Sequence, residues 1–344
     1  MTQSKRTALV VCPGRGVYNA SELGYFGRHH GDKAALLAAF DDQRRAAGQT
    51  PIAELDSAER FSMSQFTRGD NASGLIYACS IGDFQSIDPD AFDVVAVTGN
   101  SMGWYTTLAC AGALSAEDGF RTVNTMGAIM QDQLIGGQLI YPIVDENWRE
   151  DTKARNRILK LVAETDGLHV SIMLGGMMVL AGTHEAIKVA EATLAPVQDR
   201  FPMRLTNHAA FHSPLLQPNS DAGRAALPAT MFSQPDIAMI DGRGHVWSPG
   251  ASDIDALWDY TFGEQVVKTY DFTRAIQTGL REFAPDCVIV LGPGNTLGGA
   301  TAQAMLACDW HGMSTKADFS ERQASDPYLL AMGHSAQRGL VTSG

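Results

Sequence analysis

Three short apolar runs, each stopped by a glycine-rich turn, constrain the fold of this 344-residue chain more than any other feature. They read ALVVCPGRG from Ala8, FDVVAVTGNSMG from Phe92 and CVIVLGPG from Cys287. Runs this apolar are typical of strands buried on both faces of a parallel sheet, and small-residue helical segments follow the second and third runs. The pattern predicts an α/β fold with a parallel-sheet core like that of the α/β-hydrolases, and ligands at the carboxyl ends of the strands.

A different order of elements follows between about Gly136 and Asn207. The segment reads strand GQLIYPIV, a helix from Trp148 to Thr165, strands HVSIML and MMVLAGT, helix HEAIKVAEATLAP and strand PMRLTN. This β-α-β-β-α-β order is the ferredoxin-like signature. We therefore expect a ferredoxin-like small subdomain over residues 136–207, inserted into a large α/β core of residues 1–135 and 208–344, with a cleft between them.

Composition excludes several classes of function. The five cysteines are scattered without a CxxC pair or a nearby histidine at ligand spacing, so neither a disulfide framework nor a metal site is expected. A formal net charge of -12 argues against a nucleic-acid partner, which needs a basic face. No apolar run is long enough to cross a membrane, and the first residues lack a signal-peptide pattern. We expect a cytoplasmic protein without a membrane partner or a metal or redox cofactor.

The sequence GNSMG, from Gly99 to Gly103, lies between an apolar strand and a helix. Glycines in a GxSxG pattern permit a strained turn that lifts the serine hydroxyl out of the sheet, which makes Ser101 the candidate nucleophile. A serine hydroxyl needs a neighbouring base, and His212 in AAFHSPLL follows a strand at the same expected sheet edge. His208 is its nearest competitor. Other histidines have the sequence surroundings of surface or loop residues: His29, His30, His184, His245, His311 and His334.

Five segments, in order, resemble the malonyl-CoA:acyl carrier protein transacylases and the acyltransferase domains of fatty-acid and polyketide synthases. CPGRG resembles the PGQG loop of that family, GNSMGWYTTLACAGALS its GHSLGEYxALxxAGALS, and AAFHSPLL its HAFHSPLM. QVVKTYDF resembles QLxxPVxF, and VLGPGNTLGG resembles EVGPGxxL. The resemblance spans nearly the whole chain, and five ordered motifs are far more specific than one.

The resemblance implies that Ser101 and His212 form a catalytic dyad, with the Gln265 side chain near it. It assigns the oxyanion hole to the backbone N–H groups of Arg15 and Met102, and Arg15 stands where the family has glutamine. It also implies the substrates, which are an acyl-CoA and the phosphopantetheine thiol of an acyl carrier protein, with no bound cofactor.

One departure from the family concerns the acyl group. Members that use malonyl groups carry an arginine 25 residues after the nucleophile, where it pairs with the malonyl carboxylate, and this chain has Met126 there. Asn100 and Trp104 replace a histidine and a glutamate, whereas Phe211 is kept, and the resemblance implies that it favours unbranched acyl groups. Burying a carboxylate without a cation costs several kcal/mol. We therefore expect Asn100, Trp104, Met126 and Phe211 to line a pocket for a non-carboxylated, unbranched acyl donor.

Three alternatives remain open. The chain could be a true malonyl transferase despite Met126, an acyl-thioester hydrolase of the same fold, or a carrier-binding homologue without activity. For carrier docking, Lys153, Arg157 and Lys160 fall on one face of a predicted helix, an arrangement that a merely solvated helix face also produces.

Overall fold

The computed structural model describes residues 4–343, and a six-stranded sheet lies at its centre. The strand order is β11-β10-β1-β2-β7-β8, with every pairing parallel except that of β7 with β8. The strands are β1 (Arg6–Cys12), β2 (Phe92–Gly99), β7 (Ala238–Ile240), β8 (Val246–Trp247), β10 (Cys287–Val290) and β11 (Leu329–Ala331). The three apolar runs become β1, β2 and β10, which lie side by side in the middle of the sheet, so both their faces are buried.

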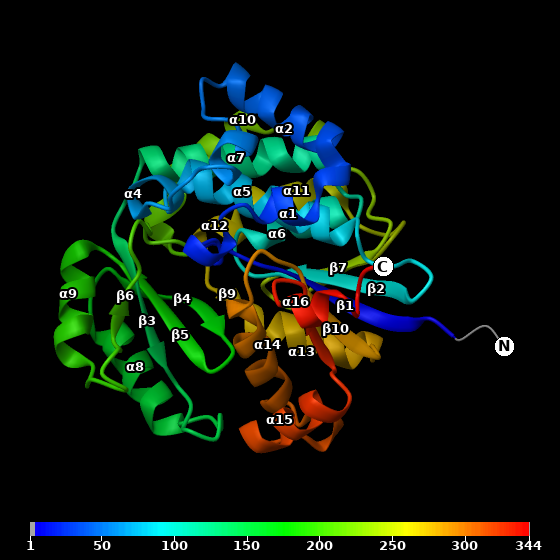
Figure 1. Ribbon diagram of the computed structural model, residues 1–344. Helices are drawn as coiled ribbons and strands as arrows, with labels where there is room; N and C mark the ends of the chain where they lie inside the picture. The colour runs from blue at the N-terminus through cyan, green and yellow to red at the C-terminus, as the bar shows by residue number, and fades with distance from the viewer. Residues whose placement is uncertain (1–3, 344) are drawn as a thin grey trace.

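Helices cover both faces of this sheet (Figure 1). α5 (Gly69–Phe84), α6 (Gly103–Cys110) and α7 (Ala116–Asp132) lie on one side, and α13 (Phe272–Phe283) and α14 (Thr296–Leu306) lie on the other. The remaining helices of the core are α1 (Tyr25–His29), α2 (Ala34–Ala46), α3 (Ile52–Asp56), α4 (Met63–Phe66), α10 (Gln217–Ala226), α11 (Ile254–Phe262), α12 (Glu264–Val267), α15 (Lys316–Ser325) and α16 (Ser335–Arg338). None of the helices within residues 4–343 is long and apolar enough to cross a membrane.

A second sheet of five strands has the order β6-β3-β5-β4-β9. Its strands are β3 (Gly137–Pro142), β4 (Leu168–Leu174), β5 (Met177–Gly182), β6 (Met203–Arg204) and β9 (Tyr270–Asp271), and α8 (Thr152–Glu164) and α9 (His184–Thr193) belong to the same unit. Leu139, Ile158, Leu180 and Ile187 belong to a hydrophobic cluster of its own. β9 comes from the core segment of the chain and pairs in parallel with β4, so main-chain hydrogen bonds join the two sheets' units.

The first four of these strands have the ferredoxin-like arrangement, and the predicted fold class is confirmed. The helix expected from Trp148 begins later, at Thr152, because the carboxylate of Asp151 caps it by accepting from the Ala154 N–H at 2.9 Å. Trp148 itself lies in the preceding turn with φ of 64°.

Candidate active site

Ser101 occupies a tight turn between β2 and α6, with φ of 54°. Few residues other than glycine adopt this left-handed conformation, and it is the geometry of a nucleophile turn. A Cβ on Gly103 would lie 2.3 Å from the carbonyl oxygen of Cys12, and one on Gly99 would lie 2.4 Å from that of Gly103. The two glycines of GNSMG therefore let the turn pack against the end of β1.

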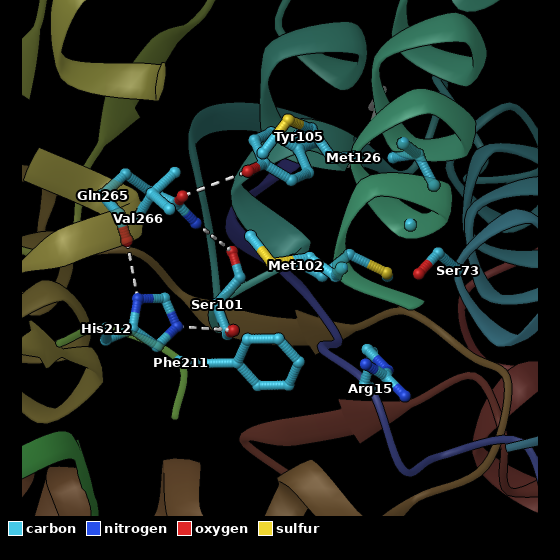
Figure 2. Close-up of a pocket in the computed structure, with 13 residues that line it drawn as sticks. Arg15, Ser73, Ser101, Met102, Tyr105, Met126, Phe211, His212, Gln265 and Val266 are labelled. Atoms are coloured by element: carbon cyan, nitrogen blue, oxygen red, sulfur yellow. Dashed lines mark hydrogen bonds between the residues drawn. The ribbon is translucent and has the colours of Figure 1, made fainter. Parts of the chain in front are cut away.

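His212 faces this serine (Figure 2). Its Nε2 lies 2.7 Å from Ser101 Oγ, and its Nδ1 lies 2.6 Å from the main-chain carbonyl oxygen of Gln265. A carbonyl oxygen only accepts, so Nδ1 carries the hydrogen and Nε2 is left to accept the serine proton. Burial lowers the pKa of His212 to about 4, against the smaller raising effect of the Gln265 hydrogen bond, so the imidazole is neutral near pH 7.

The small subdomain holds the loop that carries His212. Ser171 Oγ on β4 donates to the carbonyl of Phe211 at 2.8 Å, and Gln138 Nε2 on β3 donates to that serine at 2.6 Å. Gln138 Oε1 in turn lies 2.8 Å from Nδ1 of His208. His208 is thus the outer member of a polar chain that supports the loop, whereas His212 is the histidine that contacts Ser101.

Gln265 contacts the nucleophile turn through its side chain as well. Its Nε2 donates to the carbonyl of Ser101 at 3.0 Å, and its Oε1 accepts from the hydroxyl of Tyr105 at 3.2 Å. The sequence predicted a side chain near the active site here, but not the role of the Gln265 main-chain carbonyl or of Tyr105. Tyr105 could have been identified from the sequence, because it matches the tyrosine of the family's GEY segment. No sequence pattern identifies the carbonyl.

A narrow cavity of about 50 Å³ opens beside Ser101. Seven residues predicted for the site or its oxyanion hole line it, namely Arg15, Ser101, Met102, Met126, Phe211, His212 and Gln265, together with Ser73, Tyr105, Val123, Gly127, Met130 and Val266. The cavity offers a mostly apolar space for an acyl group attached to Ser101.

Two of the residues predicted for the acyl pocket do not line this cavity. Trp104 is fully buried in the core, where its Nε1 donates to Oγ1 of Thr261 at 3.0 Å and its ring packs edge-on against Tyr260. Asn100 is buried beside Gly14. The turn directs Ser101 towards the cavity, whereas Trp104, which lies in the first turn of α6, points towards α11.

His30 corrects another sequence expectation. It was assigned to the surface or a loop, but its side chain is fully buried and its Nε2 lies 3.0 Å from Oδ1 of Asp83. Asp83 also accepts from Arg338 Nη1 at 2.6 Å. His30, Asp83 and Arg338 together link α5 to the C-terminal segment. Because these residues are far apart in the chain, no local sequence pattern reveals their contact.

Met102 and Arg15 line the same cavity as Ser101, and within residues 4–343 their backbone N–H groups have no intramolecular acceptor. A second cavity gives access to the dyad. A larger cavity of about 600 Å³ borders His212 and Gln265 and is lined by residues of both subdomains, including His169, Arg243 and Lys268. His212 therefore stands between a small apolar cavity and a large, more polar one.

Curated proteins similar to this chain are transacylases and polyketide synthases. The malonyl CoA-acyl carrier protein transacylase of Bacillus subtilis is 23% identical over 231 residues, which is 67% of this chain and 70% of that protein. The phenolphthiocerol synthesis polyketide synthase Pks15/1 of Mycobacterium marinum is 23% identical over 311 residues, 87% of this chain. The chain spans only 14% of the length of that synthase. No family model matches the chain.

Solved structures share the fold across nearly the whole chain. The malonyl-CoA:acyl carrier protein transacylase of Xanthomonas oryzae has a TM-score of 0.75 at 18% identity and covers 99% of this chain and 100% of its own. A malonyl-transacylase solved in complex with a type II polyketide synthase acyl-carrier protein has a TM-score of 0.72, also at 18% identity, and the match covers 97% of both chains. The resemblance predicted from the five motifs is confirmed.

Proposed function

We propose that this distant relative of the malonyl-CoA:acyl carrier protein transacylases is an acyltransferase that moves an acyl group from a CoA thioester, through an acyl-serine at Ser101, to the thiol of an acyl carrier protein. The observation that carries this proposal is the 2.7 Å contact between Ser101 Oγ and His212 Nε2, with the opposite ring nitrogen bound to a carbonyl. A neutral imidazole in that orientation is ready to remove the serine proton.

In the first half-reaction Ser101 Oγ attacks the thioester carbonyl carbon while His212 Nε2 takes the hydroxyl proton. The carbon–sulfur bond then breaks, and the proton on His212 passes to the departing CoA sulfur, which leaves as a thiol. The negative charge on the carbonyl oxygen is received by the N–H groups of Met102 and Arg15, an assignment supported by their lack of an intramolecular acceptor within residues 4–343. One such donor typically contributes about 3 kcal/mol to the transition state.

In the second half-reaction the phosphopantetheine thiol attacks the acyl-serine. His212 Nε2 takes the thiol proton and returns it to Ser101 Oγ as the ester carbon–oxygen bond breaks. The large cavity beside His212 offers space for the incoming thiol. An acyl carrier protein as acceptor is supported by the names of the transacylases and by the carrier-protein complex among the solved structures.

The carrier would dock on the basic face of α8. Lys153, Arg157 and Lys160 are all exposed there, on the helix outside the second sheet. Of these three, Lys160 alone has an acidic partner within 4.0 Å in the described residues 4–343, with its Nζ 3.7 Å from Glu164. Carrier proteins are typically acidic, so an exposed basic face complements them in an otherwise acidic chain.

The nature of the donor is the finer part of the proposal. The sequence hypothesis, a donor without a carboxylate, depended on Met126, and Met126 does line the acyl cavity. The related transacylases are named for malonyl transfer. Met126 alone does not decide between these donors, because Arg15 enters the same cavity from another segment.

The proposal is tested by following the acyl group. Wild-type protein incubated with an acyl-CoA is expected to gain one acyl mass and to lose it on addition of phosphopantetheinylated carrier protein, which gains it. Release of free acid at the same rate without a carrier would instead identify the hydrolase. Absence of any acyl adduct with every CoA thioester tested would support the non-catalytic homologue.

A further inference from the structure

Arg15 brings a positive charge into an otherwise apolar acyl cavity. Its side chain lines the cavity together with Ser101 and Met126, and its Cζ lies 5.3 Å from the centre of the Phe211 ring. Figure 2 shows Arg15 beside Phe211, whose ring faces the Ser101–His212 pair. The guanidinium therefore lies next to the space that an acyl group on Ser101 would occupy.

The donors of this guanidinium are only partly used. Nη2 donates to the carbonyls of Thr67 at 2.9 Å and Asn207 at 3.0 Å. Within residues 4–343, the buried Nε has no acceptor, Nη1 makes no hydrogen bond, and no carboxylate lies within 4.0 Å of the group. The contacts to Thr67 and Asn207 explain how Arg15 is anchored, but they leave donors on two nitrogens available.

Burial also affects the protonation of this group. Burial lowers the pKa of Arg15 to about 10, although the nearby charge of Asp70 acts in the opposite direction. Arg15 is therefore still charged at neutral pH. A partly buried guanidinium without a carboxylate partner is unfavourable, and a ligand carboxylate would neutralise it.

We propose that Arg15 selects the acyl group, by placing its charge and a free Nη1 donor against the terminal carboxylate of a malonyl-type donor. This inference rests on the proposed function, since it concerns the group that Ser101 receives. Arg15, in the loop after β1, then supplies the positive charge that is absent at position 126, where this chain has methionine. A carboxylated donor thus replaces the non-carboxylated donor expected from the sequence.

The lining of the cavity agrees with this substrate. Met126 and Phe211 offer apolar surface, and Arg15 brings a charge into the same space. Met126 and Phe211 would pack against the methylene, and the carboxylate would meet Arg15 at the Phe211 side of the cavity. An acetyl group would fit, but it would leave the arginine without a partner.

The test compares acylation of Ser101 by malonyl-, acetyl- and butyryl-CoA, measured as the rate of adduct formation by intact-protein mass spectrometry. Wild type is expected to prefer malonyl-CoA. Arg15→Gln keeps the main-chain N–H but removes the charge, so the ratio of kcat/KM for malonyl-CoA over acetyl-CoA should fall about 100-fold, a typical loss for a charge-assisted pair. For Arg15→Lys this ratio should lie between those of wild type and Arg15→Gln, because lysine keeps the charge but not the guanidinium donors.

Arg204→Gln is the matched control, because Arg204 borders a neighbouring cavity shared with Arg15 but does not line the acyl cavity. It should leave the malonyl-to-acetyl ratio at the wild-type value. A wild type that prefers acetyl- or butyryl-CoA overturns the inference. So does an Arg15→Gln variant that slows all three donors equally with a lowered Tm, because that marks a purely structural arginine. Absence of an adduct from every thioester in wild type overturns the proposed function together with the inference, whereas adducts with an unchanged ratio overturn the inference alone.

Discussion

The imidazole Nδ1 of His212 lies 2.6 Å from the main-chain carbonyl oxygen of Gln265, so a peptide group rather than a carboxylate orients this histidine. A neutral carbonyl fixes the tautomer but stabilises the imidazolium less than a buried carboxylate would. The pKa of His212 is low because burial lowers it and this one hydrogen bond raises it only by a smaller amount. The same glutamine binds the Ser101 carbonyl through its side chain, so one residue positions both members of the dyad.

The pH dependence of acylation should reflect this environment. With the pKa of His212 lowered to about 4, the base is unprotonated above that value and is lost as the pH falls through it. The acid limb of kcat/KM for acyl-CoA should therefore have its midpoint near pH 4, not near the 6.5 of an ordinary histidine. Rapid-quench mass spectrometry across this range measures it. A midpoint between about pH 6 and 7 would show that His212 is charged more easily than its burial implies.

Ser101→Ala should abolish the acyl adduct, because Ser101 is the nucleophile bonded to His212 Nε2. Ser73 supplies the matched comparison, since it also carries a hydroxyl that lines the cavity. Ser73→Ala should still take up one acyl mass, with the label mapping to the peptide that contains Ser101. Labelling that disappears in Ser73→Ala and survives in Ser101→Ala would reassign the nucleophile.

Gln265→Ala should destabilise the protein and slow acylation without moving the acid limb. It removes the side-chain bonds to Ser101 and Tyr105, with an expected loss of about 1–3 kcal/mol in the free energy of unfolding, but it keeps the carbonyl that binds His212. Tyr105→Phe removes one of these bonds and should cost about 1 kcal/mol. The double variant should lose less than the sum of the two, as denaturant unfolding would reveal. Fully additive losses would contradict a shared network.

Gly103→Ala should disrupt the nucleophile turn. The new methyl group would lie 2.3 Å from the carbonyl oxygen of Cys12, and overpacking of this kind typically costs about 1–3 kcal/mol. Gly299→Ala is the control, since Gly299 is an exposed residue of α14 with no atom near its added Cβ, and alanine there should stabilise by up to about 1 kcal/mol. Thermal unfolding separates the two, and equal Tm shifts would argue against the close approach.

Charge reversal on α8 tests the docking face. Arg157→Glu with Lys160→Glu should raise the KM for an acidic carrier protein about tenfold or more while leaving hydrolysis or acylation from acyl-CoA alone unaltered. The control pair is Arg121→Glu with Arg281→Glu, which changes the net charge equally at exposed positions of the large core. If both pairs raise the carrier KM to the same extent, overall charge rather than the α8 face governs the encounter.

The sequence alone predicted the fold class and the nucleophile. Apolar runs bounded by glycine-rich turns favour buried strands, and the glycines around Ser101 permit a tight turn, whereas His212 was identified through the family motif. The order of elements also predicts the ferredoxin-like unit, because this order can be recognised without knowing which side chains meet.

Tertiary structure decided what surrounds the dyad. Trp104 was expected in the acyl pocket, but the direction of α6 turns it towards Thr261 in the core. The sequence indicated a role only for the backbone of Arg15. Its side chain nevertheless enters the cavity, which Met126 had suggested would hold no positive charge. The carbonyl that orients His212 could not be identified from sequence either. Each of these contacts joins segments far apart in the chain, and their geometry depends on how helices and loops pack rather than on any local pattern.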